Sequence, residues 1–222
     1  MEKARIRAGF FHGRRAVSVG AMPTSTEGRA ALRADLRDRR RALPPAERIA
    51  AAERLAGRLA ALPFMPRSGA VAGYWAMDGE IALHAWQLRL PASVDYCLPV
   101  LHEDGRLRFA PWRPGEPLAP NRFGIPEPAV AEDALLPGDA LGLVVLPLVG
   151  FDASGQRLGM GAGWYDRTFA FRHGTSSAPW LVGAAFAAQQ VDALAAEPWD
   201  VPMDALCTER DTFLFPPEAP AA

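Results

Sequence analysis

Three glycines at alternate positions, Gly159, Gly161 and Gly163, form the part of the sequence best suited to chemistry. Glycine lets the backbone adopt positive φ angles and approach a ligand closely. Successive backbone N–H groups in such a loop, beside a helix N-terminus, bind anions. The loop follows an apolar run at residues 141–149 and a turn at residues 152–156. This pattern predicts a phosphate-binding loop between a buried strand and a helix.

The loop is neither of the two commonest phosphate-binding types. The Rossmann fingerprint requires a third glycine three places after Gly161, where Trp164 stands. A P-loop requires Gly-Lys followed by Ser or Thr, and the sequence has no such tripeptide. A glycine-rich surface turn without a ligand is the alternative interpretation.

Two charged neighbours favour the phosphate interpretation. Arg157 brings a fixed positive charge, as phosphate recognition requires. Asp166 would repel a phosphate by roughly 4 kcal/mol at about 4 Å and an effective dielectric near 20. A bound Mg²⁺ reverses that sign, so Asp166 suggests a metal–nucleotide complex. The alternative is a carboxylate that complements the dipole of the following helix.

The residues around the loop closely resemble the signature of the 5-formyltetrahydrofolate cyclo-ligases, also called 5,10-methenyltetrahydrofolate synthetases. The matching residues are Phe151-Asp152, Gly155, Arg157-Leu158-Gly159, Gly161, Gly163 and Tyr165-Asp166. Further segments match in family order: Leu32-Arg33, Arg40-Arg41-Ala42-Leu43, Glu47-Arg48, residues 74–81, Leu98-Pro99-Val100, Phe123-Gly124-Ile125, Glu127-Pro128, residues 200–204 and Thr208-Glu209. The resemblance runs from about residue 29 to residue 213.

The resemblance implies an ATP- and Mg²⁺-dependent ligase that cyclises 5-formyltetrahydrofolate to 5,10-methenyltetrahydrofolate and releases ADP and phosphate. In that reaction the formyl oxygen attacks the γ-phosphate, N10 of the folate closes onto the activated carbon, and phosphate leaves. Such an enzyme must align two substrates and neutralise phosphate charge, without supplying a covalent nucleophile. The sequence agrees, because it lacks a G-x-S-x-G motif and neither cysteine lies in a catalytic motif.

The resemblance also implies roles for particular residues. It assigns ATP binding to Arg29, Arg33, Arg157, Leu158, Gly159, Met160, Gly161, Ala162, Gly163, Trp164 and Tyr165. It assigns folate binding to Trp75, Glu80, Met160, Gly161, Ala162, Gly163 and Trp164. The catalytic residues would be Arg157, Tyr165 and Asp166, and Mg²⁺ would be held by Asp166 and Asp200.

Each assignment has a structural alternative. Arg29 and Arg33 could line a solvated helix face, and Asp200 could form a turn before a proline. Trp75 could be a core aromatic and Glu80 a helix-start carboxylate. The family usually has Lys at the position of Arg29.

The glycine loop also departs from the family at three positions. Tyr is usual where Trp164 stands, and Met160 and Ala162 occupy variable places. These departures concern substrate preference, because they leave the phosphate-binding glycines intact.

The composition indicates one cytoplasmic enzyme domain acting on small molecules. The chain has 222 residues, half of them apolar, which is enough for a single core. Its net charge of −1 provides no field for nucleic acid or an anionic membrane, and we expect a monomer. Cys97 and Cys207 lie in apolar runs and are interpreted as core residues. The four histidines, His12, His84, His102 and His173, show no metal-ligand spacing.

Three regions are expected along the chain. Residues 1–26 form a basic extension, interpreted as disordered or as an upstream start with Met22 the true beginning; an organelle-targeting peptide is the alternative. Residues 27–216 form the α/β domain, and residues 217–222 form a tail. The sequence assigns no role to residues 123–128.

The expected elements alternate between helices and strands. Helices are expected at residues 28–43, capped by Thr26-Glu27, and at 45–62, 80–90 and after Gly163; strands are expected at 69–75, 94–100, 107–112, 141–149 and 180–186. In the second helix, Ile49, Leu55, Leu59 and Leu62 mark the core face. The proline-rich residues 111–137 are expected to be mostly loop. This order predicts a single three-layer α/β domain with a mostly parallel sheet, Rossmann-like and of the sugar-phosphate isomerase and CoA-transferase type. Ligands then bind beyond the carboxyl ends of the strands.

Two other functions remain as alternatives. A sugar-phosphate isomerase or CoA-transferase-like enzyme would bind phosphate without ATP or Mg²⁺, and Asp166 argues against it. A non-catalytic folate- or nucleotide-binding protein would keep the pockets without the reaction.

Overall fold

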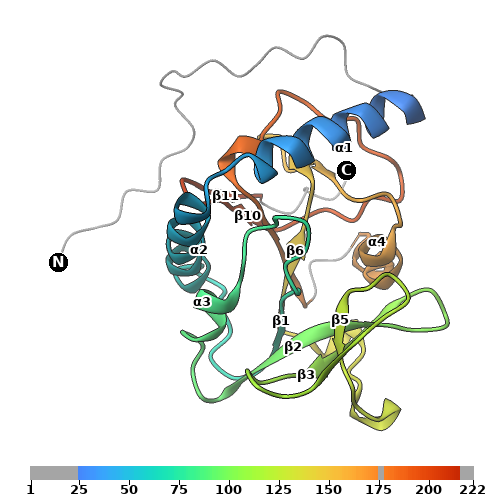
Figure 1. Ribbon diagram of the computed structural model, residues 1–222. Helices are drawn as coiled ribbons and strands as arrows, with labels where there is room; N and C mark the ends of the chain where they lie inside the picture. Colours follow the sequence, from blue (N-terminus) through green and yellow to red (C-terminus); the bar gives the residue numbers. More distant parts are fainter. Residues whose placement is uncertain (1–24, 175–177, 216–222) are drawn as a thin grey trace.

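A seven-stranded sheet lies at the centre of the computed structural model, which describes residues 25–174 and 178–215 (Figure 1). Its strands are β1 (Gly69–Ala72), β2 (Val94–Leu101), β3 (Leu107–Pro111), β6 (Leu143–Pro147), β9 (Trp180–Ala184), β10 (Ala205–Cys207) and β11 (Thr212–Leu214). The strand order is β11-β10-β9-β6-β1-β2-β3. The five inner strands are parallel, and β3 and β11 pair antiparallel at the two edges. The mostly parallel α/β sheet is therefore confirmed.

Two short hairpins extend the fold beyond the main sheet. In the proline-rich region, β4 (Leu118–Pro120) pairs with β5 (Pro126–Pro128), and the rest of that region is mostly loop, as expected. After β6, the strand β7 (Gly150–Phe151) pairs with β8 (Arg157–Leu158). The second hairpin ends directly before the glycine loop.

The helices cover both faces and one end of the sheet. They are α1 (Thr26–Arg41), α2 (Pro45–Ala60), α3 (His84–Gln87) and α4 (Trp164–Thr168), with 3₁₀ turns at Glu132–Ala134, Gly138–Ala140, Ala170–Arg172 and Ala187–Gln189. The first helix begins earlier than predicted, because the Ser25 side chain caps it by accepting the Gly28 N–H at 3.1 Å. In the part of the chain that the structure describes, no helix is long and apolar enough to cross a membrane.

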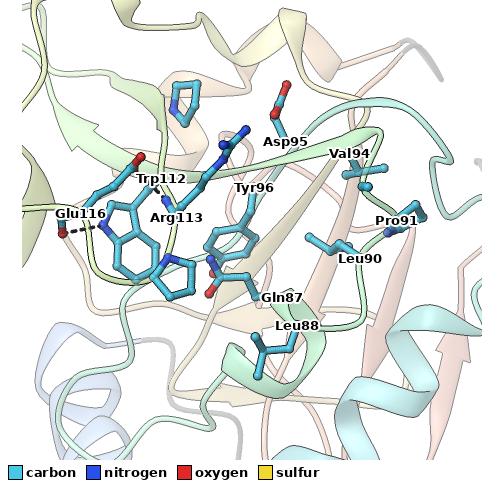
Figure 2. Close-up of a pocket in the computed structure, with 13 residues that line it drawn as sticks. Gln87, Leu88, Leu90, Pro91, Val94, Asp95, Tyr96, Trp112, Arg113 and Glu116 are labelled. Atoms are coloured by element: carbon cyan, nitrogen blue, oxygen red, sulfur yellow. Dashed lines mark hydrogen bonds between the residues drawn. The ribbon is translucent and has the colours of Figure 1, made fainter.

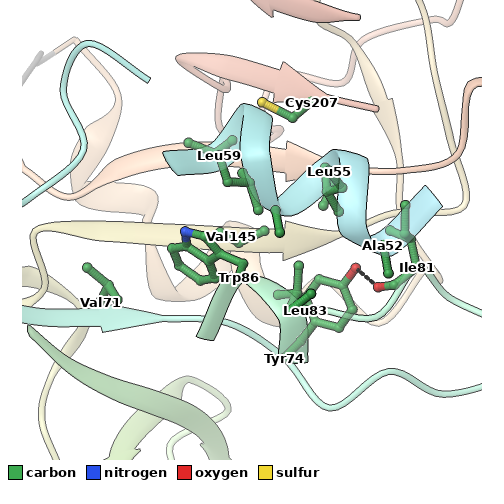
Figure 3. Close-up of a cluster of buried hydrophobic side chains, with 14 of the residues drawn as sticks. Ala52, Leu55, Leu59, Val71, Tyr74, Ile81, Leu83, Trp86, Val145 and Cys207 are labelled. Atoms are coloured by element: carbon green, nitrogen blue, oxygen red, sulfur yellow. Dashed lines mark hydrogen bonds between the residues drawn. The ribbon is translucent and has the colours of Figure 1, made fainter. Parts of the chain in front are cut away.

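The core on one face of the sheet is built from α2 and α3 (Figure 3). Leu55, Leu59 and Leu62 are buried there, as the sequence predicts. The prediction was wrong for Ile49, which is 65% exposed. The buried residues of α2 begin at Ala51 and Ala52, and Ile49 lies before them, in the first turns of the helix.

The predicted helix at residues 80–90 was wrong in extent, because only His84–Gln87 is helical. The Tyr74 hydroxyl donates to the Ile81 carbonyl at 2.7 Å, a bond that Figure 3 shows. The Glu80 carboxylate accepts the Met77 N–H at 3.0 Å. These bonds hold residues 77–81 in a turn and occupy groups that a longer helix would use. Three predicted strands also end or begin two to three residues inside their expected limits, at Ala72, Leu143 and Ala184.

The opposite face of the sheet is covered by α4 and by segments between β9 and β10. Phe169, Val201 and Met203 pack there with residues of the sheet. Cys97 is buried on this face, Cys207 is buried on the other, and both are free thiols, which confirms their core placement. Burial raises the pKa of Cys97 to about 12 and that of Cys207 to about 11, so neither thiol is a reactive nucleophile.

Helix α1 packs over the chain segments that follow β6 and β9. Its buried Leu32 and Leu36 form a separate cluster with Val149, Leu158 and Leu194. The extension expected at residues 1–26 lies outside the described residues except for Ser25 and Thr26, and so does the tail at residues 217–222. Helix α1 thus crosses the carboxyl-end side of the sheet, where ligands are expected.

A buried carboxylate ties the hairpin before the glycine loop to the segment after β9. Oδ1 of Asp152 accepts the backbone N–H groups of Ser154 at 2.9 Å and Gln156 at 3.1 Å. Its Oδ2 accepts the Leu194 N–H at 2.8 Å. The Asp152 carboxylate therefore links the β7–β8 turn to the segment after β9 by accepting backbone hydrogen bonds from both.

Replacement of Asp152 by alanine should lower the free energy of unfolding by about 2–4 kcal/mol, because buried N–H donors lose their partner. Urea denaturation of Asp152→Ala and of wild type measures the difference. Asp139→Ala is the control, since Asp139 is exposed, and it should change stability by less than about 0.5 kcal/mol. Equal effects of the two substitutions would contradict the structural role of Asp152.

Candidate functional site

The glycine loop at residues 159–163 connects β8 to α4, and two of its glycines are required by geometry. Gly161 has φ 98° and Gly163 has φ 66°, angles that L side chains rarely adopt. A Cβ atom on Gly161 would stand 3.4 Å from the Arg33 guanidinium, and one on Gly163 would stand 2.9 Å from Nη1 of Arg167. Gly159 has neither restraint, because nothing lies within 4 Å of its Cβ position.

The loop presents unpaired backbone donors beside a guanidinium group. Within the described residues, no protein acceptor receives a hydrogen bond from the N–H groups of residues 159–162. Nε of Arg33 donates to the Gly159 carbonyl at 2.8 Å, which fixes the Arg33 side chain against the loop. Partial burial, followed by the neighbouring Arg29 and Arg37, lowers the pKa of Arg33. The loop and Arg33 together can therefore bind an anion such as phosphate.

Arg157 lies beside the loop but faces a carboxylate. Its guanidinium donates to the Asp166 carboxylate and to the Val201 carbonyl, and its side chain is 9% exposed. Oδ1 of Asp166 also accepts the Val201 N–H at 3.2 Å. In this arrangement Arg157 orients Asp166, whereas Arg33 and Arg167 donate to loop carbonyls, Arg33 to Gly159 and Arg167 to Ala162, each at 2.8 Å.

The two aspartates predicted as metal ligands come from segments that meet at Val201. Val201 N–H donates to Asp166, and Asp200, the preceding residue, accepts the Glu197 N–H through Oδ2 at 2.9 Å. Among the described residues, Oδ2 of Asp166 and Oδ1 of Asp200 have no hydrogen-bond partner. No group of three or more His, Cys, Asp or Glu residues that could hold a metal is present in the same part of the chain. Two such carboxylates fit Mg²⁺ when a nucleotide supplies phosphate oxygens, since Mg²⁺ commonly binds through one or two carboxylates plus substrate phosphates.

Arg29, the other arginine of α1 that was predicted to bind ATP, contacts the segment after β9. Nη1 of Arg29 lies 3.1 Å from Oε1 of Glu197 and 3.4 Å from the Ala195 carbonyl. A small cleft is lined there by Arg29, Leu32, Arg157, Leu158, Leu194 and Ala195. The structure thus brings Arg29, Arg33 and the glycine loop to one side of α1.

The predicted folate residues follow β1, at its carboxyl end. Trp75 is 37% exposed and packs edge-to-face on Trp112, with ring centroids 5.7 Å apart. The Glu80 side chain is 14% exposed. Burial raises the pKa of Glu80, opposed by the Met77 N–H bond and by the positive charge of Arg40. Burial and then Glu80 raise the pKa of Tyr165, so the β1 loop and α4 share one electrostatic environment.

The structure adds a contact that the sequence did not predict, between the glycine loop and the β4–β5 hairpin. Two guanidinium carbons lie near the Trp164 ring, that of Arg122 at 5.5 Å and that of Arg167 at 5.2 Å from its centroid. Arg122 also stands 5.2 Å from the ring of Phe123, which is 58% exposed. An exposed aromatic beside an arginine in a turn was the available signal, but only the fold shows that this turn reaches Trp164.

A separate groove of about 630 Å³ lies between α3 and the strands β2 and β3 (Figure 2). Tyr96 and Trp112 bring aromatic rings to it, and the Trp112 indole N–H donates to the Glu116 carbonyl at 3.2 Å. It contains none of the predicted site residues. We therefore place the candidate site at the glycine loop and the β1 loop.

Comparison with known proteins identifies similar chains along nearly the whole described sequence. The model of the 5-formyltetrahydrofolate cyclo-ligase family matches residues 25–209. The 5-formyltetrahydrofolate cyclo-ligase of Escherichia coli (strain K12) is 37% identical over 176 residues, which are 78% of this chain and 96% of that protein. The Haemophilus influenzae protein of the same name is 41% identical over 136 residues, 60% of this chain and 72% of that one.

Solved structures show a similar fold. The 5,10-methenyltetrahydrofolate synthetase of Aquifex aeolicus matches with a TM-score of 0.72 and 27% identity, covering 87% of this chain and 95% of that one. The structure of a 5,10-methenyltetrahydrofolate synthetase from Mycoplasma pneumoniae matches with a TM-score of 0.61 at 21% identity, covering 82% and 98%. The second match supports the fold alone.

The left-handed conformation of Gly161 predicts different costs for two neighbouring substitutions. Gly161→Ala should lower the free energy of unfolding by about 1–2 kcal/mol, because alanine at positive φ is strained. Gly159→Ala is the matched control, and its change in stability should be smaller, since its Cβ position is open and its φ is not positive. Chemical denaturation of both variants checks this, and equal costs would show that the loop conformation is not fixed by Gly161.

Proposed function

Because the chain belongs to the 5-formyltetrahydrofolate cyclo-ligase family, we propose that the glycine loop, α1 and the β1 loop form its active site. The chain is a ligase of folate one-carbon metabolism, which closes 5-formyltetrahydrofolate to 5,10-methenyltetrahydrofolate. Its family uses ATP as co-substrate. The observation that best supports the location of the site is the row of unpaired N–H groups at residues 159–162 beside Arg33.

In this proposal the glycine loop binds the phosphates of ATP. The unpaired N–H groups and the nearby Arg33 guanidinium donate to phosphate oxygens, and hydrogen bonds to charged groups typically contribute about 1.5–3 kcal/mol each. Arg29 adds positive charge one turn earlier on α1. Of the remaining residues assigned to ATP, Met160 and Ala162 carry two of these N–H groups, and Leu158, Trp164 and Tyr165 flank the loop in sequence.

Asp166 and Asp200 are proposed to hold Mg²⁺, each through the oxygen that has no hydrogen-bond partner among the described residues. When bound, Mg²⁺ neutralises the negative charge of the nucleotide phosphates. Arg157 positions Asp166 by its ion pair and holds the neighbouring segment through the Val201 carbonyl.

The folate is proposed to bind between the β1 loop and the glycine loop. Glu80 accepts N–H groups of the pterin ring, and the Trp75 ring packs on its flat face. Trp164, near the Arg122 and Arg167 guanidinium groups, and Tyr165, whose hydroxyl interacts electrostatically with Glu80, belong to α4 and complete this region. The formyl oxygen can then meet the γ-phosphate, because both ligands are fixed around the same loop, and such alignment supplies a large part of the rate of phosphoryl transfer.

We further propose a monomeric, cytoplasmic enzyme without nucleic-acid or membrane partners. A net charge of −1 gives it no strong attraction to polyanions, and two buried free thiols suit a reducing compartment. The isomerase-like, CoA-transferase-like and non-catalytic alternatives gain no support from a particular contact in the structure.

Purified protein with 5-formyltetrahydrofolate, ATP and Mg²⁺ should produce the near-ultraviolet absorbance of 5,10-methenyltetrahydrofolate. Omission of either ATP or Mg²⁺ should abolish the change, since the formyl oxygen must be phosphorylated before ring closure. The rate is measured from the absorbance of the product as a function of time. A flat trace from correctly folded protein would reject the proposed activity and favour the non-catalytic alternative.

Asp166→Asn should reduce turnover and raise the Mg²⁺ concentration needed for half-maximal activity by roughly 10–100-fold. The substitution keeps an oxygen for the Val201 N–H but removes the charge that a cation requires. Titration of activity with Mg²⁺ at fixed ATP measures the effect, and Asp192→Asn, at an exposed position, is the control. An unchanged Mg²⁺ dependence would leave Asp166 with only its structural ion pair to Arg157.

A further inference from the structure

Arg40 of α1 is a fully buried cation that is only partly paired. Its side chain is 0% exposed. Nε donates to the Asp78 carbonyl at 3.0 Å, and Nη2 donates to the Asp78 carboxylate at 3.0 Å. Nη1 has no hydrogen-bond partner and stands 3.8 Å from Oε1 of Glu80. The unpaired donor therefore lies near the Glu80 carboxylate, which we propose binds folate.

The stability of the fold does not explain this arrangement. A buried guanidinium with an unpaired N–H costs free energy, and an apolar side chain at such a position is often neutral or stabilising. Asp78 does not depend on Arg40 for a counter-ion, because Arg41 donates to its other carboxylate oxygen. The contribution that only Arg40 makes is a buried positive charge next to the Glu80 carboxylate.

The groups around Glu80 make that charge important. The charged and titratable groups near Glu80 are the Asp78 carboxylate from its own loop, the hydroxyls of Tyr74, just after β1, and of Tyr165 in α4, and the Arg40 guanidinium of α1. Burial and Asp78 favour the protonated carboxyl, whereas Arg40 and the Met77 N–H favour the carboxylate. A pterin ring offers N–H donors, and only the ionised form lets both oxygens act as acceptors, Oε2 in addition to its bond from the Met77 N–H.

We propose that Arg40 is a positioning residue for folate recognition, which holds the Glu80 carboxylate ionised and oriented without touching the substrate itself. Its unpaired Nη1 can form a hydrogen bond with Glu80 by a movement of roughly 1 Å. This inference rests on the proposed folate role of Glu80. It extends the folate site to the last turn of α1, whose earlier turns carry Arg29 and Arg33.

The test compares Arg40→Met with Arg40→Lys by separate titration of each variant with 5-formyltetrahydrofolate and with ATP. Arg40→Met should weaken folate binding by about tenfold or more and leave ATP binding within about twofold, since only Glu80 loses its counter-charge. Arg40→Lys keeps the charge and should recover part of the folate affinity. Arg41→Met is the matched control, because it removes a guanidinium from the same Asp78 and leaves Arg40 beside Glu80.

The pH dependence of folate binding provides a readout that a purely structural role would not change. Folate affinity should fall as the pH drops through the pKa of Glu80, because protonation removes an acceptor. Loss of the Arg40 charge raises that pKa, so in Arg40→Met the affinity should fall at a higher pH than in wild type. Equal weakening of folate and ATP with an unshifted pH profile would overturn the proposal.

Glu80→Gln separates failure of this inference from failure of the site assignment. If Glu80→Gln binds folate as wild type does, the folate role of Glu80 is wrong and Arg40 has nothing to position. If Glu80→Gln weakens folate binding but Arg40→Met does not, the inference on Arg40 alone is wrong.

The double variant Arg40→Met/Glu80→Gln keeps the test decisive if Arg40→Met alone does not fold, because it removes both buried charges together. It should bind folate no more weakly than Glu80→Gln. A further loss beyond Glu80→Gln would show that Arg40 acts by another route.

Discussion

The packing of α1 across the segments that follow β6 and β9 is the contact on which the site depends. Leu32 and Leu36 bury their side chains against Val149, Leu158 and Leu194. Arg29 and Arg33 each lie three residues before one of these leucines, on the same side of the helix, so the apolar contact brings them to loops from distant parts of the sequence. Arg33 reaches the glycine loop, and Arg29 reaches Glu197. A few buried leucines thus place the Arg29 and Arg33 guanidinium groups at the proposed phosphate site.

The site is built from paired opposite charges rather than from a cluster of one sign. Arg157 holds Asp166, Arg29 holds Glu197, and Arg40 holds Asp78 while it faces Glu80. Each pair joins two segments that are far apart in the chain. Because several of these groups are partly or fully buried, each pair stabilises an orientation more than it adds to stability. Such preorganisation suits a reaction in which the protein aligns two substrates.

The proposed phosphate site at the glycine loop has neither a Rossmann fingerprint nor a P-loop. Helix α4 has only five residues, so its dipole contributes little. The unpaired backbone N–H groups of residues 159–162 and the Arg33 guanidinium supply the donors instead. The loop conformation depends on the positive φ angles of Gly161 and Gly163. In this site, backbone conformation replaces the long helix of the commoner phosphate loops.

The sequence by itself determined the family, the α/β class and the position of the glycine loop. These depend on local patterns, namely an apolar run, alternate glycines and neighbouring residues that match the family signature in order. It also located the β1 loop with Trp75 and Glu80. Only the tertiary structure decided that Ile49 is exposed, that residues 80–83 are not helical, and that the β4–β5 turn reaches Trp164. It alone showed that Arg157 faces Asp166 and that Arg40 stands behind Glu80. Ion pairs across long sequence separations follow from how elements pack, and no periodicity or spacing within one segment contains that information.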